Sequence, residues 1–264
     1  MQLDWRSYDD VAEIYERVHA PRFAEPARDL VALAGVAPGW KVLDVGTGTG
    51  VVGAAAIATG AEVVGVDPSP GMLAVARRQR PELPVYEAEA IDLPFPAGSF
   101  DCVLAGFVVA HFAKPDTALF DVLRVTRPGG TIAVSAWADR QDTFTSTWLD
   151  LVHDVVPKEV LDAAMAQAIP HHDRFRKADV LSQVLHEAGV RKIRIERTVY
   201  EWHYTRAEYL EGLQTWATAR FVRGMLDDIA WDRLLLRAAE VFSARFPDPL
   251  HDRRAVLLAS GVKG

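Results

Sequence analysis

The chain has one cysteine among 264 residues, no long run of basic residues and no long apolar run. The lone thiol, Cys102, lies in an apolar stretch, which excludes an internal disulfide and predicts an unreactive core residue. A formal net charge of −7 without a basic run argues against a DNA or RNA substrate. No apolar run approaches the roughly 20 residues that a membrane-spanning helix needs, and the start of the chain lacks a signal-peptide pattern. We therefore expect a cytoplasmic location without membrane or nucleic-acid partners.

Half of the residues are hydrophobic, which is enough for a substantial core. Up to about residue 137 short apolar strands alternate with helical patterns, and this alternation is typical of βαβ units and a parallel sheet. The predicted strands are 41–45, 62–67, 84–88, 100–106 and 130–136, and the predicted helices between them are 49–58, 70–80 and 116–126.

Beyond Trp137 the pattern changes to longer amphipathic stretches. Helices are expected at 142–155, 158–168, 178–188, 206–223 and 229–245, strands at 192–202 and 254–261, and an N-terminal helix at 8–19. Two regions, 138–175 and 204–251, are surplus to the sheet. We expect them to cover, with the N-terminal helix, the carboxyl ends of the strands, where ligands bind in open α/β sheets.

Residues 41–53 read KVLDVGTGTGVVG, a short apolar strand that runs into a glycine-rich turn. Glycine lets the backbone approach a ligand closely, so a nucleotide-like ligand is expected. Asp44 would repel a pyrophosphate at this turn, and no Lys or Arg lies between Val42 and Gly60 to offset it. A ligand with a cationic tail is therefore favoured.

A second apolar strand ends at Asp67, seventeen residues after Gly50. In dinucleotide folds an acid roughly 20 residues beyond the loop accepts hydrogen bonds from the ribose, so Asp67 implies an adenosine group. Gly48, Gly50 and Gly53 also match the dinucleotide pattern G-x-G-x-x-G, although out of register with the strand end. An NAD(P)-dependent oxidoreductase therefore stays an alternative.

Five ordered segments resemble the class I S-adenosylmethionine-dependent methyltransferases, in particular the ubiquinone and menaquinone biosynthesis group. The segments are VLDVGTGTG at 42–50, VVGVDPSPGMLAVA at 63–76, EAEAIDLPFPAGSFDCV at 87–103, GFVVAHF at 106–112 and LRVTRPGGTIAVSAW at 123–137. The resemblance implies an α/β fold with a doubly wound, Rossmann-like sheet of seven strands, mostly parallel with an antiparallel last strand, plus a helical lid.

The same resemblance divides the chain by role. Residues 1–264 are expected to form one methyltransferase domain, with an N-terminal helical cap at 1–40 and a cofactor-binding core at 41–137. The two surplus regions, 138–175 and 204–251, are here called the lid, and they are expected to hold the methyl acceptor. A monomer or homodimer is expected.

The family's cofactor roles are carried over onto matching positions of this sequence. Asp44 is expected near the ammonium group of S-adenosylmethionine, Asp67 at the ribose hydroxyls, and Met72 against the adenine. The family commonly has Gly-Asp-Ala where this chain has Ala88-Glu89-Ala90, so the longer Glu89 would have to reach the adenine amino group. The full set of expected cofactor residues is Tyr15, Asp44, Gly46, Thr47, Gly48, Gly50, Asp67, Pro68, Met72, Glu89, Ala90, Ile91, Gly106 and Phe107.

Methyl transfer is an in-line displacement on an activated sulfonium, so positioning and desolvation supply much of the rate and no fixed triad is needed. His111 is the family-matched residue nearest the transferred methyl and the candidate general base, although it more often shapes the cofactor pocket. Tyr8 and Tyr15, seven residues apart on the N-terminal helix, are candidates to face the methionine end.

The other histidines and the lid aromatics predict less. His171 and His172 precede Asp173, but no Cys or acid cluster supports a metal site, so no metal is expected. The side chains that could line an acceptor pocket are His153, His203, Trp148, Trp202, Tyr204, Trp216, Phe221 and Trp231. Aromatics at helical spacing are more often lid core, yet their abundance suits a large, flat or apolar acceptor.

The sequence thus predicts a methyltransferase that acts on a small molecule such as a quinone precursor, a polyketide or another secondary metabolite. O-transfer is favoured over C-transfer, and C-transfer over N-transfer. A non-transferring cofactor-binding protein of the same fold is a further alternative.

Overall fold

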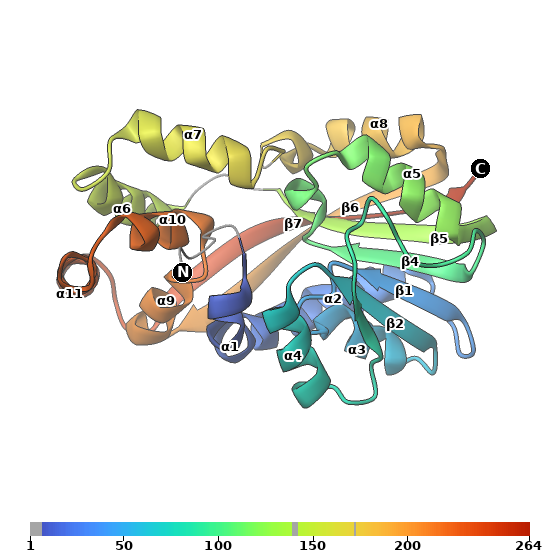
Figure 1. Cartoon of the computed structure of the whole chain (residues 1–264), viewed down its shortest axis with the longest axis horizontal. Helices are drawn as coiled ribbons and strands as arrows, with labels where there is room; N and C mark the ends of the chain where they lie inside the picture. The colour runs from blue at the N-terminus through green and yellow to red at the C-terminus, as the bar shows by residue number, and fades with distance from the viewer. Residues whose placement is uncertain (1–6, 139–141, 172) are drawn as a thin grey trace.

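A computed structural model describes residues 7–138, 142–171 and 173–264 of the protein. Seven strands form one sheet in the order β3-β2-β1-β4-β5-β7-β6 (Figure 1). The strands are β1 (Lys41–Val45), β2 (Glu62–Asp67), β3 (Val85–Glu87), β4 (Phe100–Gly106), β5 (Thr126–Trp137), β6 (Val190–Tyr204) and β7 (Leu250–Lys263). The first five are parallel, and β7 runs antiparallel to both β5 and β6. The predicted fold is confirmed.

Helices cover both faces of this sheet and one end of it. They are α1 (Ala12–Ile14), α2 (Ala20–Ala34), α3 (Val51–Ile57), α4 (Pro70–Gln79), α5 (Pro115–Val125), α6 (Thr143–His153), α7 (Lys158–Ala168), α8 (Ala178–Ala188), α9 (Arg206–Leu213), α10 (Ala217–Met225) and α11 (Asp228–Arg245). In Figure 1, α5 and α8 lie on one face, α2, α3 and α4 on the other, and α6, α7 and α9 to α11 beyond one end.

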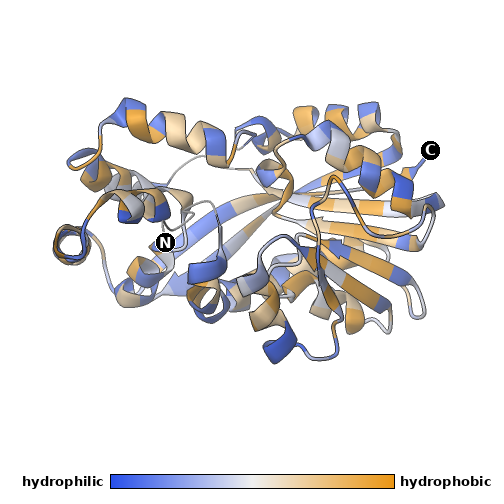
Figure 2. Ribbon diagram, in the orientation of Figure 1, coloured by the Kyte–Doolittle hydropathy of each residue, from blue (hydrophilic) through white to orange (hydrophobic). Residues whose placement is uncertain are grey.

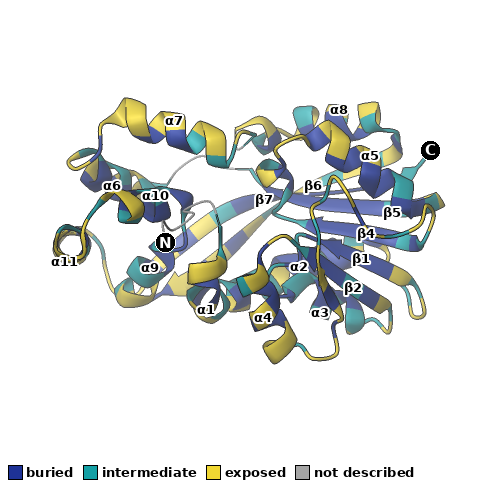
Figure 3. Cartoon of the chain, in the orientation of Figure 1, coloured by how far each residue is buried: buried dark blue, intermediate teal, exposed yellow. Residues whose placement is uncertain are grey.

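The core has two large apolar clusters, because a parallel sheet with helices on both faces buries both sides of its strands. Figures 2 and 3 show the result: the central strands are apolar and buried, whereas the outer helix faces are polar and exposed. One cluster continues from Val42 and Leu104 on the sheet to Trp148 and Phe242 in the lid. Trp148 is fully buried, and its indole N–H donates to the Thr218 hydroxyl at 3.1 Å.

The N-terminal helix is longer than expected. Residues 8–19 were the predicted range, but the helical path begins with a 3₁₀ turn at Asp9–Val11 and continues through α2 to Ala34. A π-helical turn, Tyr15–His19, lies within it, and such turns are frequent at functional sites. Gly35, in the left-handed region at φ 66°, ends the helix.

The predicted helix 206–223 is wrong as a single element, because it is broken between α9 and α10. A continuing helix would need the Gly212 carbonyl to accept from the Trp216 amide. That carbonyl instead accepts from the Thr215 hydroxyl at 2.8 Å and from His19 Nε2 at 3.1 Å, while the Trp216 amide donates to Leu213. A histidine from the N-terminal cap therefore helps to set the break.

Candidate cofactor and acceptor site

The glycine-rich turn after β1 contains glycines of two kinds. A Cβ on Gly46, Gly50 or Gly53 would overlap the side chains of Val108, Arg80 or Leu83, so these glycines allow close packing. At Gly48, φ is +56° and a Cβ would meet nothing within 4 Å. Gly48 is therefore the glycine of this turn whose backbone faces open space.

Asp44 lies beneath the turn and is almost fully buried. Its Oδ2 accepts from the Thr47 hydroxyl at 2.6 Å and from the Gly53 amide at 2.8 Å. Its Oδ1 is buried without a hydrogen-bond partner among the described residues. Burial raises the pKa of Asp44 to about 7, and the Asp67 carboxylate adds to that shift. An orphaned buried carboxylate oxygen requires an explanation, and a cationic ligand group supplies one.

Asp67 ends β2 and contacts the same turn. Its Oδ2 accepts from the Gly48 amide at 2.9 Å, and its Oδ1 accepts from the Ser69 amide at 2.9 Å. Burial is the main cause that raises the pKa of this carboxyl. The structure thus brings Asp44, Gly48 and Asp67 to the same turn, and their roles toward a cofactor stay predictions.

The Asp44 carboxyl predicts a pH dependence of ligand binding. The pKa of this carboxyl is about 7 in the folded protein and 3.8 in an unfolded chain, so the folded protein keeps a proton that the unfolded chain loses. The stability that this proton contributes is lost as pH rises from about 4 to 7. A cationic ligand group needs the ionised form. S-adenosylhomocysteine affinity should therefore fall by up to about tenfold per pH unit below about 7, measured by calorimetry in buffers of different ionisation enthalpy.

Asp44→Asn is the control for this pH dependence, because its amide oxygen still accepts from Thr47 and Gly53. The variant should bind more weakly but with a flatter pH profile. An unchanged slope in the variant would assign the proton to another group, such as Asp67.

The N-terminal cap is fixed over α4 by three acids that sequence reasoning missed. Asp9 Oδ1 accepts from the Ser69 hydroxyl at 2.6 Å and the Gly71 amide at 2.7 Å. Glu13 pairs with Arg78 at 2.7 Å. The spacing of residues 9, 13 and 16 on one helical face was the available signal.

The third acid, Glu16, pairs with Arg80 at 3.1 Å. Arg80 also donates to the Thr49 carbonyl at 2.7 Å, on the turn itself. The turn has no Lys or Arg nearby in sequence, but the fold supplies this one, already paired with an acid. Arg80 therefore fixes the turn and leaves the charge at Asp44 uncompensated.

The predicted adenine contacts lie on two elements. Met72, on α4, is 4% exposed and packs with Ala12 beneath the rings of Tyr8 and Tyr15. The other expected contacts, Glu89, Ala90 and Ile91, form a turn after β3. Pro68, between β2 and α4, is exposed.

Phe107 follows β4 with φ +58°, a left-handed conformation that is uncommon for a residue other than glycine. Its amide donates to the carbonyl and the hydroxyl of Ser135 at 3.1 and 3.0 Å, which holds this conformation. Neighbouring Gly106 packs against Val52, where a Cβ would overlap. Strained residues gather at functional sites, so Phe107 is a candidate at the end of the cofactor nearest the acceptor.

Aromatic side chains form a row from the cap to the sheet. Ring centroids are 5.9 Å apart for Tyr15 and Phe23, 5.0 Å for Phe23 and Phe107, and 4.7 Å for Phe107 and Trp137. All four are partly exposed. Beside the row is a small pocket, lined by Phe107, Val109, Ala110, Ala136, Trp137 and Phe175. Sequence reasoning missed Phe23 and Trp137, because helical periodicity alone gave no reason to place them here.

His111 is exposed at the end of the 3₁₀ turn Val109–His111. Its ring lies edge-on to Tyr8 at 6.1 Å, and Tyr8 lies 6.3 Å from Tyr15. The Arg220 guanidinium, from α10 of the lid, lies 4.0 Å from the centre of the Tyr8 ring. The cap, the lid and the end of β4 therefore meet at Tyr8.

The lid aromatics separate into core and site candidates. Trp148 and Trp231 are buried in the lid core. Trp216 is partly exposed and lies 5.8 Å from the Arg254 guanidinium, which is equally far from Trp137. Among the remaining candidates, Trp202 contacts Trp137, and the ring of Tyr204 lies beneath the Arg22 guanidinium. Phe221 is partly exposed, and His153 ends α6. His203 stacks on His251 at the surface.

The His171-His172-Asp173 segment is only partly described, because His172 lies outside the described residues. Within the described ranges, no three His, Cys, Asp or Glu side chains are grouped so as to hold a metal ion. None of the described helices combines the length and apolar character that crossing a bilayer requires.

A comparison with protein families decides the class of this fold. Residues 43–134 match the model of the methyltransferase domain family. The chain carries a class I methyltransferase domain. S-adenosylmethionine is the cofactor of this class, and the resemblance predicted from the sequence is confirmed.

Relatives of the methyltransferase domain support the same group. The demethylmenaquinone methyltransferase of Renibacterium salmoninarum is 36% identical over 135 residues, which are 50% of this chain and 57% of that protein. The chain therefore spans little more than half the length of this curated relative.

Two solved structures share the fold of the methyltransferase domain at low sequence identity. A Thermotoga maritima S-adenosylmethionine-dependent methyltransferase, possibly a histamine N-methyltransferase, is 17% identical with a TM-score of 0.59 over 98% of this chain and 99% of that one. Haemonchus contortus phosphoethanolamine N-methyltransferase 2, in complex with S-adenosylmethionine, is 18% identical with a TM-score of 0.61 over 99% and 60%.

Proposed function

We propose that this protein transfers a methyl group from S-adenosylmethionine to a flat, largely apolar small molecule. The observation that carries the proposal is the position of Gly48, whose backbone faces open space beside the buried carboxylate of Asp44 and the partly buried carboxylate of Asp67. Asp44 offers an unpartnered oxygen, and Asp67 lies at the other side of the glycine. These two carboxylate acceptors fit a ligand that donates from an ammonium group at one end and from ribose hydroxyls at the other.

Each cofactor residue then has a physical role. Asp44 faces the ammonium, Asp67 accepts from the ribose hydroxyls, and the Gly48 backbone approaches the chain between them. Bound S-adenosylmethionine supplies a methyl group on a sulfonium that is already activated to leave. The protein's own part is to orient the acceptor, to exclude water and to hold the reacting groups in line.

The aromatic row supports the class of acceptor. Phe23, Phe107, Trp137 and, from the lid, Trp216 present partly exposed rings. Such rings suit a quinone precursor, a polyketide or another flat secondary metabolite rather than a small polar acceptor. We favour O-transfer, then C-transfer, then N-transfer. The lid regions 138–175 and 204–251 would enclose the acceptor.

The proposed role of His111 is to shape the pocket. His111 is exposed and contacts Tyr8 of the cap. His111→Ala should therefore loosen the cap and lower cofactor affinity and turnover together, each by less than about tenfold, measured by calorimetry and initial rates. A loss in turnover of roughly 100-fold at unchanged cofactor affinity would instead identify a general base.

The function as a whole is tested by ligand screening and product analysis. S-adenosylmethionine and S-adenosylhomocysteine should raise the unfolding temperature. At a hundredfold excess over Kd the free energy of unfolding should rise by about 2.7 kcal/mol, whereas NAD and NADP should leave it unchanged. Stabilisation by the nicotinamide cofactors alone would favour the oxidoreductase alternative.

Incubation with methyl-labelled S-adenosylmethionine and a panel of phenols, quinols and aromatic amines should then label one product class. Tight cofactor binding with no labelled product from any acceptor, including a cell metabolite extract, would favour the non-transferring alternative.

A further inference from the structure

The turn that carries Glu89 to Ile91 lies where the sheet gives it least support. β3 has three residues and lies at the edge of the sheet. One side of the turn is tied to the ribose site, because the Ala88 amide donates to the Asp67 carbonyl at 3.3 Å. Glu89 and Ile91 are exposed, so burial does not fix their positions.

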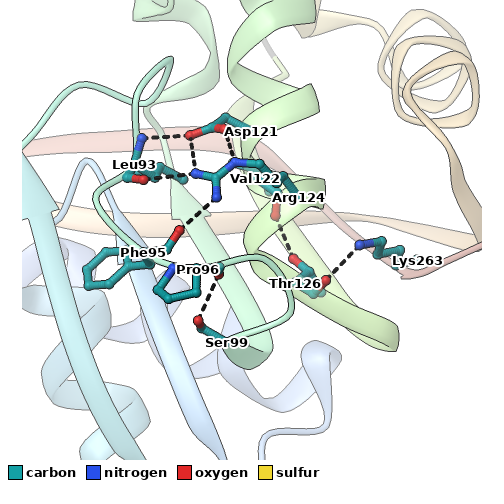
Figure 4. Close-up of polar contacts among 9 residues, drawn as sticks. All are labelled: Leu93, Phe95, Pro96, Ser99, Asp121, Val122, Arg124, Thr126 and Lys263. Atoms are coloured by element: carbon teal, nitrogen blue, oxygen red, sulfur yellow. Dashed lines mark hydrogen bonds and ion pairs between the residues drawn. The ribbon is translucent and has the colours of Figure 1, made fainter.

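The other side of the turn is held from α5 by a pair of charged residues, Asp121 and Arg124 (Figure 4). Asp121 Oδ2 accepts from the Leu93 amide at 2.6 Å. Arg124 donates to the Leu93 carbonyl at 2.9 Å and to the Phe95 carbonyl at 2.7 Å. The two side chains also pair with each other at 2.5 Å. One ion pair thus satisfies three backbone groups of the segment that follows the turn.

The pair stands on a rigid element. The C-terminal end of α5 is fixed by the Thr126 hydroxyl, which donates to the Val122 carbonyl at 2.7 Å, and by Lys263 of β7, which donates to the Thr126 carbonyl at 2.8 Å (Figure 4). The Arg124 carbonyl accepts from the Gly98 amide at 2.9 Å. The segment after β3 is therefore held along its length by one helix end.

The charges of the pair are stable in this position. Burial alone would raise the pKa of Asp121, but hydrogen bonds from Arg124 and the Leu93 amide outweigh it and lower that pKa. Leu93 itself is buried at 2% exposure. A planar guanidinium that bonds an acid and two carbonyls at once sets both the position and the direction of the chain, which a lysine does not reproduce.

We propose that Asp121 and Arg124 are positioning residues that make the cofactor site selective for adenine. They would act through the turn at 89–91. By binding the backbone of Leu93 and Phe95, which follow the turn, they would hold it at a fixed distance from Asp67. The inference rests on the proposed function, because it takes the turn to contact the adenine edge. Neither residue contacts Asp44, Gly48 or Asp67, so binding of the ammonium group and the ribose of the cofactor should be unaffected.

The test compares two ligands on the full chain. S-adenosylhomocysteine and S-inosylhomocysteine differ at the adenine edge, where oxygen replaces the amino group. The parent should bind S-adenosylhomocysteine about tenfold more tightly than S-inosylhomocysteine, which corresponds to one hydrogen bond to a charged group. In Arg124→Gln this preference should fall to about twofold or less, because the adenine affinity falls and the hypoxanthine affinity changes little. Calorimetry gives both dissociation constants.

Two further variants keep the result interpretable. Arg124→Lys retains the charge without the planar guanidinium, and it should give an intermediate preference for adenine. It serves as the test if Arg124→Gln fails to fold. Arg127→Gln is the matched control, because Arg127 lies three residues away and pairs with Asp101 at 2.6 Å, remote from the turn. It should keep the parent's preference.

The outcomes are distinct. If Arg124→Gln weakens both ligands equally, the pair has only a structural role and the proposal is wrong. A parent that binds both ligands equally well also overturns the proposal, while the proposed function stands. A parent that binds neither ligand overturns the proposed function itself.

Discussion

Asp67→Ala is expected to weaken S-adenosylhomocysteine binding by roughly 100-fold or more, because a carboxylate that accepts from two ribose hydroxyls contributes two hydrogen bonds to a charged group. The free protein should lose little stability. The variant gives up the bonds to the Gly48 and Ser69 amides, but it also removes a carboxylate whose charged form burial disfavours. Calorimetry of ligand binding and thermal unfolding of the free protein measure both effects.

Glu62→Ala is the matched control, because Glu62 is the exposed first residue of β2, at the opposite end of the strand from Asp67. It should bind the ligand as the parent does. If Asp67→Ala bound as tightly as Glu62→Ala, Asp67 would be a fold residue that holds Gly48, and the ribose would have to lie elsewhere.

The central strands could be predicted from the sequence because their signals are local. β1, β2 and β4 have the predicted bounds, since each is a short apolar run that ends at, or just before, a glycine or an acid. The grouping of Asp44, Gly48 and Asp67 was also predictable, because parallel strands that are adjacent bring their carboxyl ends to one edge of the sheet.

The features that sequence reasoning missed all depend on contacts between distant segments. The break between α9 and α10 involves His19, almost 200 residues earlier, through a hydrogen bond to the Gly212 carbonyl. Burial lowers the pKa of His19 to about 4, so its neutral ring donates from Nε2, since a carbonyl only accepts. No helical periodicity at 206–223 contains that information.

The lid shows the same limit. Trp148 and Trp216 look alike as aromatics in amphipathic stretches, yet one is fully buried against Thr218 and the other is partly exposed beside Arg254. Residue type gives the tendency to be buried, whereas the packing partner decides it. The glycines of the turn follow the same reasoning. They look alike in the sequence, yet a Cβ would overlap a side chain at Gly46, Gly50 and Gly53 and would meet nothing at Gly48.

Gly48→Val is expected to affect cofactor binding as strongly as Asp67→Ala. In the free protein a Cβ at this position meets nothing within 4 Å, so the first atom of a side chain has room, and the main cost is strain of about 1–2 kcal/mol from a positive φ. With the cofactor bound, the same space would have to hold both the side chain and the ligand. Affinity for S-adenosylhomocysteine should therefore fall by at least about 100-fold, which is about 2.7 kcal/mol.

Gly129→Val separates strain from ligand exclusion. Gly129 has φ +70°, also has nothing within 4 Å of a Cβ, and is exposed near the start of β5. Both variants should lose similar stability in thermal unfolding of the free protein, because both place a β-branched residue in the left-handed region. Only Gly48→Val should lose the ligand. If the two variants bound S-adenosylhomocysteine equally well, the open space at Gly48 would not be the place where the cofactor lies.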